Sequence, residues 1–335
     1  MSKPASHMTT TSSAQIEKQA QTASDRLSKA KLAIGEVVYG QDRVVDLALA
    51  AMLSGGHTLL VGVPGLAKTL LVETLGTVMG LDNKRVQFTP DLMPADIIGS
   101  EVLEEGAKGK RSFRFIPGPV FTQLLMADEI NRASPRTQSA LLQAMQEKSV
   151  TIAGAEHALP VPFHVLATQN PIEHEGTYPL PEAQLDRFFY NIKIGYPTIE
   201  EEEKIVNLTT GKDFPTASAI LDTKGVIALQ DATLDVPLPE NVVKAILNLT
   251  HSTRPGSDQA TDFVNNYISY GAGPRASQCL ARAVRALALL RGKPAASIDE
   301  LKDAALPILR HRITPNYNAT GEGITEDDII KKLLS

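Results

Sequence analysis

The sequence contains one cysteine, no tryptophan and no long hydrophobic run. Cys279 cannot form a disulfide within the chain, which favours a reducing compartment. No apolar stretch approaches the roughly 20 residues that a membrane-spanning helix needs. Residues 1–15 are polar and lack the apolar core of a signal peptide. We therefore expect a cytoplasmic protein without a membrane segment.

An excess of positive charge is also missing, because 33 Lys and Arg residues stand against 38 Asp and Glu residues, a formal net charge of -5. Extended contact with nucleic acid requires a basic surface, so this balance disfavours nucleic acid as a partner. With 43% hydrophobic and 21% charged residues, the composition is typical of a folded globular protein. A chain of 335 residues is long enough for two domains.

Strands and helices alternate over the first part of the chain. Short apolar runs predict three buried strands, at 57–61, 124–127 and 163–168. Helical spacing predicts a helix at 42–52, before the first strand, and helices between strands at 68–79 and 136–148. Turn residues between extended flanks predict two hairpins, at 98–116 and 150–163. Buried strands interleaved with helices indicate an α/β fold with a parallel sheet covered on both faces.

The strand pattern fades after residue 197, and the rest of the chain is helical in pattern. Helices are predicted at 199–208, 240–250, 275–290 and 298–309. At the C-terminus, 313–323 could form an edge strand and 327–334 a short amphipathic helix. We expect three parts: a disordered tail or tag remnant at 1–13, an α/β core at 14–211 and a smaller all-α domain at 212–335.

The segment Gly62–Thr69 reads GVPGLAKT and joins a predicted strand to a predicted helix. Such a loop presents backbone N–H groups and a helix N-terminus to phosphate groups. In this arrangement Lys68 reaches the β and γ phosphates of a nucleotide, and the Thr69 hydroxyl ligates Mg²⁺. The plain structural alternative is a glycine-rich turn followed by a lysine without a special role.

Ala67 departs from the general phosphate-loop formula G-x-x-x-x-G-K-[ST], which has glycine at this position. Alanine is acceptable there if the residue already has the right-handed α conformation at the start of the helix. We therefore expect Ala67 to be right-handed and the loop to keep its function.

The run LLMADE ends a predicted buried strand with two adjacent carboxylates, Asp128 and Glu129. At the carboxyl edge of a parallel sheet, Asp128 can hold the metal through water and Glu129 can accept a proton from an attacking water. A solvated acidic strand end is the structural alternative. The tetrad at 83–86 lacks the aspartate of a guanine-reading Asn-Lys-x-Asp motif, so adenine is favoured.

A third polar residue, Asn170, follows another predicted strand in VLATQNP. A neutral amide beside the γ phosphate can orient water without adding charge. On its own, an Asn-Pro turn that closes a strand would explain the segment equally well.

These motifs together resemble the MoxR family of AAA+ ATPases. The resemblance spans roughly residues 30–312, and Ala67 is typical of the family's own phosphate loop. It rests on four segments: GVPGLAKT at 62–69, ADEINRASPRTQSALLQAMQE at 127–147, ATQNP at 167–171 and YPLPEAQLDRFF at 178–189. The resemblance implies a five-stranded αβα core with a helical lid, and a ring, usually a hexamer, with ATP at subunit boundaries. The two hairpins would be its helix-2 and pre-sensor insertions.

The resemblance also implies roles for single residues. Arg187 would be the arginine finger that reaches the neighbouring subunit's γ phosphate, although an arginine after an aspartate often forms an internal salt bridge. Arg275 would be the second-sensor arginine, acting on its own or on a neighbour's nucleotide. Segment 38–41 would lie along adenine. Nucleotide contacts are thus expected at Val38, Tyr39, Gly40, Gln41, Gly62, Val63, Pro64, Gly65, Leu66, Ala67, Lys68, Thr69, Leu70, Asp128 and Arg275.

We therefore expect an Mg²⁺-dependent ATPase that acts as a chaperone-like remodeler in the maturation or metal loading of complexes. The family resemblance implies a von Willebrand factor A domain protein as its partner. Two other functions stay open: a magnesium-chelatase-like or DNA-associated motor subunit, and a nucleotide-gated scaffold with little turnover.

Overall fold

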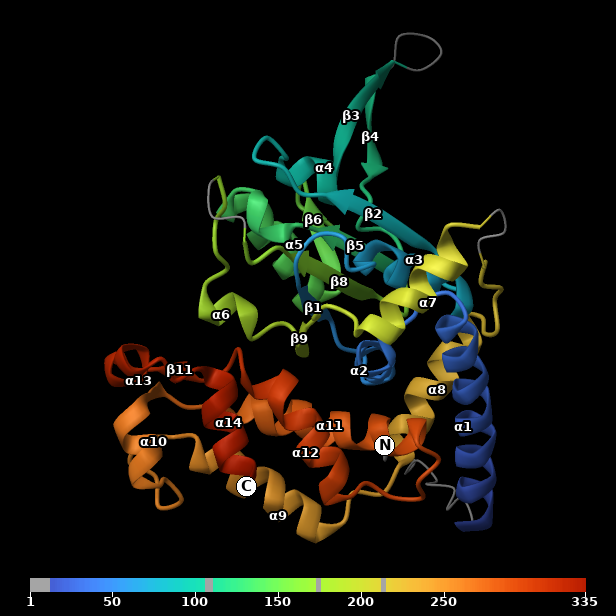
Figure 1. The fold of residues 1–335 in the computed structure, drawn as a ribbon. Helices are drawn as coiled ribbons and strands as arrows, with labels where there is room; N and C mark the ends of the chain where they lie inside the picture. The colour runs from blue at the N-terminus through green and yellow to red at the C-terminus, as the bar shows by residue number, and fades with distance from the viewer. Residues whose placement is uncertain (1–12, 106–110, 173–175, 212–214) are drawn as a thin grey trace, which may run out of the picture.

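The computed structural model describes residues 13–105, 111–172, 176–211 and 215–335 (Figure 1). Of the predicted tail at 1–13, residues 1–12 lie outside the described residues, and Ser13 begins helix α1 (Ser13–Gly35). The tip of the first predicted hairpin, 106–110, also lies outside them. None of the helices in the described part is both long and apolar enough to cross a bilayer.

A five-stranded sheet forms the centre of the molecule, and all its neighbouring strands run parallel. The three predicted buried strands, β1, β5 and β8, are its inner strands, while both edge strands escaped prediction from the residue pattern. The polar segment NKRVQ forms one edge and has a single buried residue, Val86. In spatial order the strands are β2 (Asn83–Gln87), β5 (Leu124–Asp128), β8 (His164–Gln169), β1 (Thr58–Val61) and β9 (Tyr190–Lys193).

Successive side chains of the inner strands enter two different hydrophobic clusters, as the two-residue period of a strand requires. Leu125 of β5 packs in the cluster that contains α4 (Pro94–Ile98) and α5 (Pro135–Glu147). Its neighbour Met126 packs in the cluster that contains α1, α2 (Asp42–Leu53) and α3 (Lys68–Val78). The sheet is therefore covered on both faces, which confirms the predicted fold class.

The C-terminal part is a helical lid, in the lower half of Figure 1. Most of its buried apolar side chains belong to the same cluster as α1, α2 and α3, so lid and core share one continuous hydrophobic interior. The predicted edge strand at 313–323 reduces to two residues, because α13 begins at Tyr317. The lid elements are α8 (Thr223–Asp235), α9 (Glu240–Ser252), α10 (Asp262–Tyr267), β10 (Ile268–Tyr270), α11 (Pro274–Leu290), α12 (Ile298–Leu309), β11 (Thr314–Pro315), α13 (Tyr317–Glu322) and α14 (Glu326–Leu334).

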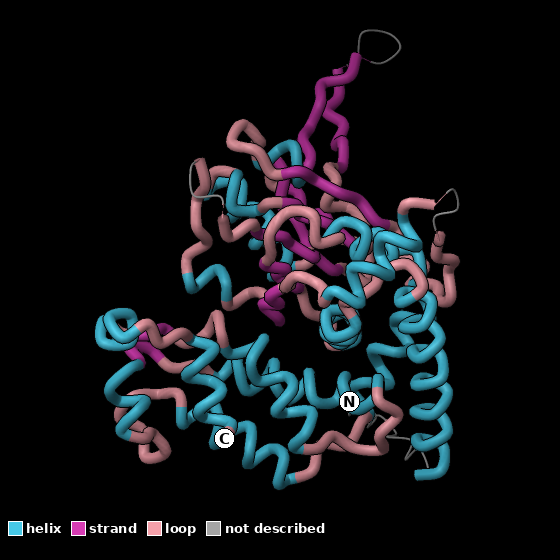
Figure 2. Tube along the Cα trace, in the orientation of Figure 1, coloured by secondary structure: helices cyan, strands magenta, loops and turns pink. Residues whose placement is uncertain are grey.

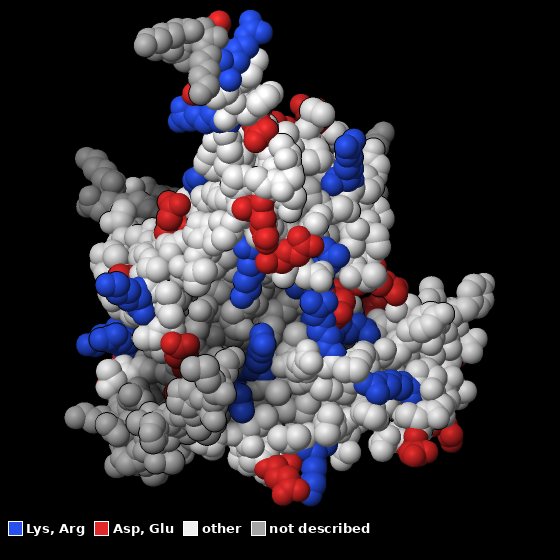
Figure 3. All heavy atoms as spheres, turned by 180° about the vertical axis from the view of Figure 1, so that it is seen from behind, with Lys and Arg blue, Asp and Glu red and all other residues white. Residues whose placement is uncertain are grey.

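Both predicted hairpins are present. The first, β3 (Gly99–Glu105) and β4 (Arg111–Pro117), projects from the body of the molecule, as the tube in Figure 2 shows. The second is formed by β6 (Ser149–Ile152) and β7 (Ala155–Ala158). The rings of Phe115 and His157 stack with centroids 4.1 Å apart, so the two hairpins contact each other at the base of the projection. On the face in Figure 3, basic and acidic side chains are interspersed.

Two buried histidines, His57 and His164, form hydrogen bonds with backbone groups near the amino ends of β1 and β8. The N–H of Val165 donates to His57 Nδ1 (3.0 Å), so His57 Nε2 donates to the Met145 carbonyl (3.1 Å). His164 Nδ1 lies 3.1 Å from the carbonyl oxygen of Gly56. Burial lowers the pKa of His57 to about 3 and that of His164 to about 4, so both rings are neutral in the folded protein.

Candidate functional site

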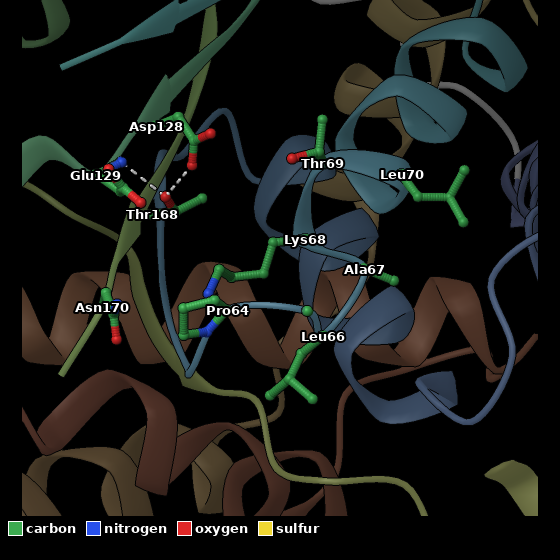
Figure 4. A pocket seen from close by; sticks show the side chains of 11 residues that line it. Pro64, Leu66, Ala67, Lys68, Thr69, Leu70, Asp128, Glu129, Thr168 and Asn170 are labelled. Carbon is green, nitrogen blue, oxygen red and sulfur yellow. Dashed lines mark hydrogen bonds between the residues drawn. The ribbon is translucent and has the colours of Figure 1, made fainter. Parts of the chain in front are cut away.

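The carboxyl ends of β1, β5 and β8 surround a cavity of about 480 Å³ (Figure 4). The loop after β1 and the first turn of α3 form one wall, and residues at the ends of β5 and β8 form the other. In parallel sheets this edge is the usual place for ligands. The lining residues are Pro64, Gly65, Leu66, Ala67, Lys68, Thr69, Leu70, Asp128, Glu129, Thr168 and Asn170.

The loop between β1 and α3 contains two residues in the left-handed region. Gly65 has φ +83°, which glycine adopts without cost, and Ala67 has φ +54° and ψ +24°. The prediction that Ala67 is right-handed is therefore wrong. Ala67 precedes the helix that begins at Lys68, and the chain turns into α3 through a left-handed residue there. Alanine keeps the conformation that suits glycine, at a cost of about 1–2 kcal/mol.

Lys68 and Thr69 form the first turn of α3, at the edge of the cavity. The Lys68 ammonium group folds back over the loop and donates to the carbonyl oxygens of Gly62 and Val63, the latter at 2.9 Å. The first N–H groups of the helix also lack intrahelical acceptors. One cation and a helix N-terminus therefore make this wall of the cavity suitable for anions.

Asp128 is nearly buried, and both of its carboxylate oxygens have partners. Arg85 of β2 contacts Oδ2 through Nη2 (2.6 Å) and Nε (3.2 Å). The hydroxyl of Thr168 donates to Oδ1 at 2.5 Å. These contacts fix the carboxylate at the end of β5, facing the phosphate loop.

Glu129 follows in a left-handed conformation, with φ +54° and ψ +51°. Its backbone N–H donates to the Thr168 hydroxyl at 2.8 Å (dashed in Figure 4), which anchors this turn. Gln87 Nε2 (2.6 Å) and Arg132 Nη1 (2.8 Å) both donate to its Oε2. The two adjacent carboxylates are therefore held separately, Asp128 by Arg85 and Glu129 by Gln87 and Arg132.

Asn170 lies beyond the end of β8 and is 3% exposed. The structure thus brings together five residues that the sequence predicted: Lys68, Thr69, Asp128, Glu129 and Asn170. Sequence reasoning missed Thr168, which hydrogen bonds to both carboxylate residues. A signal for it existed, because Thr168 stands two positions before Asn170 and so shares its side of the chain.

Other predicted residues lie outside the lining of this cavity. Arg275 forms an ion pair with Asp186 at 3.4 Å and does not line the cavity. Arg187 is half-buried next to that aspartate. Gly40 has φ +68° and lies against Glu201 of α7 (Ile199–Thr209), so segment 38–41 runs beside that helix. Adenine contacts at Val38, Tyr39, Gly40 and Gln41 stay a prediction.

The chain matches two family models. Residues 57–190 match the ATPase family associated with various cellular activities (AAA), and residues 261–333 match an AAA lid domain. The first match spans the phosphate loop, both carboxylates and Asn170. The second begins shortly before α10 and includes α11 and α12.

Known proteins are similar in sequence to this chain over about nine tenths of its length. Chaperone MoxR1 of Mycobacterium tuberculosis is 42% identical over 92% of this chain and 81% of its own length. Protein MoxR of Paracoccus denitrificans is 32% identical over 89% of this chain and 92% of its own. A crystal structure from Cytophaga hutchinsonii, assigned as an ATPase, is 39% identical with a TM-score of 0.87 and covers 95% of this chain and 96% of its own. The chain therefore belongs to the MoxR family of AAA+ ATPases.

Proposed function

We propose that this protein is an Mg²⁺-dependent ATPase. It would act as a chaperone-like remodeler that uses the energy of ATP hydrolysis to change the structure of protein complexes. One observation carries the proposal: a cation and a helix N-terminus face two carboxylates and a buried amide across a single cavity. The cavity has the volume of a small-molecule site, which is typically about 300–1,000 Å³. Membership in an ATPase family supports the same reaction.

The residues at the cavity suit a magnesium nucleotide. The Thr69 hydroxyl and the Asp128 carboxylate supply hard oxygen ligands of the kind that Mg²⁺ prefers. Lys68 and the first N–H groups of α3 suit the phosphates. When bound, Mg²⁺ would offset the negative charge of the phosphate oxygens.

Glu129 is the group that we assign as general base. Its carboxylate lies at the cavity and is hydrogen bonded on Oε2 to Gln87 and Arg132. A carboxylate in this place can take a proton from water as the water attacks the γ phosphate. Asn170 would orient that water, since a buried amide offers both a donor and an acceptor.

Arg187 is proposed to complete the site of a neighbouring subunit in a homo-oligomeric ring, most simply a hexamer. An arginine that meets the developing charge on the γ phosphate can contribute about 10³- to 10⁵-fold in rate. The projecting hairpin β3–β4 would then move against a protein client as the lid shifts. We further propose that the protein acts in the cytoplasm together with a von Willebrand factor A domain protein. Its role there would be the maturation or metal loading of protein complexes.

The proposal is tested by measuring phosphate release and nucleotide affinity for the wild-type protein and for Lys68→Ala. We expect the substitution to lower turnover by at least about 10²-fold, as removal of one strong donor from a site typically does. Glu147→Gln is the control, because the hydrogen bonds of this exposed carboxylate to described residues are both with Gln143 of the same helix, α5. Turnover of Lys68→Ala equal to wild type would refute the assignment, and ATP binding without turnover in wild type would favour a scaffold.

A further inference from the structure

Side chains of the turn that follows α12 form hydrogen bonds with the segment that leads into β9 and with β9 itself. Three consecutive side chains, Arg310, His311 and Arg312, reach from the lid to the chain at 186–191. Arg310 Nη1 donates to the Asn191 carbonyl at 3.1 Å. His311 and Arg312 therefore connect the lid to the residues on either side of Arg187, whereas Arg310 contacts β9, beyond that stretch.

Arg312 makes most of these contacts, and its side chain is only 2% exposed. Its Nε contacts Asp186 Oδ1 at 2.7 Å, and its Nη2 donates to the carbonyls of Phe188 (2.7 Å) and Asp186 (3.2 Å). Its Nη1 donates to the carbonyls of Phe189 (3.3 Å) and Ile308 (2.6 Å). A buried guanidinium with this many acceptors is held rigidly, since each lost contact would leave a desolvated polar group.

A second lid element holds the same aspartate. Arg275, in the first turn of α11, lies 3.4 Å from Asp186 Oδ2, while Arg312 contacts Oδ1. His311, also buried, has its Nε2 3.0 Å from the Phe188 carbonyl. The residues on both sides of Arg187 are thus held by α11 and by the turn after α12.

Arg187 itself stands between these fixed points. Phe188 and Phe189 are buried in the two clusters on opposite faces of the sheet, so the chain after Arg187 is anchored. Among the residues that the structure describes, no hydrogen bond or ion pair is formed by the Arg187 side chain. The backbone is therefore immobilised, while none of the described residues of the same subunit accepts a hydrogen bond from the guanidinium.

We propose that Asp186 and Arg312 are positioning residues that aim Arg187 at the neighbouring subunit's nucleotide. The inference rests on the proposed role of Arg187 as an arginine finger. Because Arg275 and Arg312 belong to the lid, a rotation of the lid displaces the carboxylate and the backbone next to the finger. The lid of one subunit thereby sets the rate of hydrolysis in the next, since displacement of a catalytic group by about 1 Å can cost about 10²-fold in rate.

Another ion-pair cluster between lid and core offers a matched control. Asp327 of α14 contacts Arg310 (3.0 Å) and Lys193 of β9 (3.0 Å), and neither contact involves 186–189. Asp186→Asn and Asp327→Asn are therefore the same chemical change at two junctions of lid and core. Only the first is next to the finger.

The test measures ATP turnover of single variants and of mixed oligomers. We expect Asp186→Asn to lower kcat roughly 10- to 100-fold, with less than a threefold change in KM, since the defect lies in the transition state. Asp327→Asn should stay within about twofold of wild type. In an Arg187→Ala background, Asp186→Asn should add less than a twofold loss, because a positioning residue has no effect without the group that it positions.

Mixing separates the finger from the subunit's own site. Asp186→Asn subunits keep their nucleotide site, and Lys68→Ala subunits keep a positioned finger. In a head-to-tail ring mixed at random in equal amounts, roughly a quarter of the interfaces pair the two intact halves, so activity should recover to that level. Recovery also shows that Asp186→Asn subunits are folded, because only their sites can turn over ATP.

Each remaining outcome overturns the proposal. Near-normal turnover of Asp186→Asn alongside a defective Arg187→Ala would remove the positioning role but leave the finger and the ATPase intact. An equal loss in Asp327→Asn, or no recovery on mixing, would assign the effect to general loosening of the lid. Normal turnover of Arg187→Ala would refute the finger itself, and with it the positioning pair.

Discussion

Replacement of Thr168 by valine tests how the two carboxylates are held. Thr168 is fully buried; its hydroxyl donates to Asp128 Oδ1 at 2.5 Å and accepts from the Glu129 N–H at 2.8 Å. Valine has nearly the same shape but neither function. The substitution therefore removes both hydrogen bonds and leaves the cavity almost unchanged.

The magnitude follows from the two lost contacts. A hydrogen bond to a charged group contributes about 1.5–3 kcal/mol, and an N–H left without an acceptor costs about 1–3 kcal/mol. Glu129 also sits in a left-handed conformation that costs about 1–2 kcal/mol and loses its anchor. We expect a loss of about 3–5 kcal/mol in the free energy of unfolding, and a fall in kcat of about 10²-fold, which corresponds to about 2.7 kcal/mol.

The assay combines thermal unfolding with steady-state phosphate release. At roughly 2 °C per kcal/mol for a chain of this size, Tm should fall by about 6–10 °C. Thr168→Ser is the control, since it keeps the hydroxyl and loses one methyl group, and its kcat should stay within about threefold of wild type. If valine and serine variants have equal turnover, Thr168 does not hold the carboxylates in place, and our reasoning about the site is refuted.

Two further predictions concern the phosphate loop and acid stability. Ala67→Gly should leave Tm within about 2 °C of wild type, because relief of left-handed strain of about 1–2 kcal/mol is largely offset by added chain entropy of about 0.4–1 kcal/mol, while Ala67→Val should lower both Tm and ATP affinity. If Ala67→Gly lowered Tm and ATP affinity more than Ala67→Val did, the result would contradict a left-handed conformation at Ala67. Since the pKa values of His57 and His164 lie near 3 and 4 when folded and near 6.5 when unfolded, the unfolded chain binds protons first, and the two together should cost about 4 kcal/mol of stability between pH 7 and pH 5. Urea titrations at both pH values check this, and a His57→Gln/His164→Gln variant with the same pH slope would contradict it.

The sequence predicted the inner part of the sheet but not its edges. β1, β5 and β8 are continuous apolar runs because both of their faces are covered. Strand β2 has one covered residue, Val86, and its Arg85 and Gln87 look like solvated polar residues until the fold places them beside Asp128 and Glu129. An edge strand of this kind carries little periodic signal.

The conformation of Ala67 was mispredicted for a physical reason. The high helix propensity of alanine favoured a right-handed conformation for Ala67 at the start of α3. The loop before the helix instead requires a left-handed residue at this position, and the strain is tolerated. The ion pair between Arg312 and Asp186 could not be predicted either. The two residues are 126 positions apart in the sequence and come into contact only because the lid packs on the core.

Glu129→Gln tests the central claim most directly, because it changes only the proposed base. Bound ATP and released phosphate should be measured on the same sample of oligomer. We predict that the variant binds ATP as tightly as wild type while its turnover falls by about 10²- to 10⁴-fold, the usual contribution of general base catalysis. Turnover equal to that of wild type would show that Glu129 does not activate water, and would contradict the proposed ATPase mechanism.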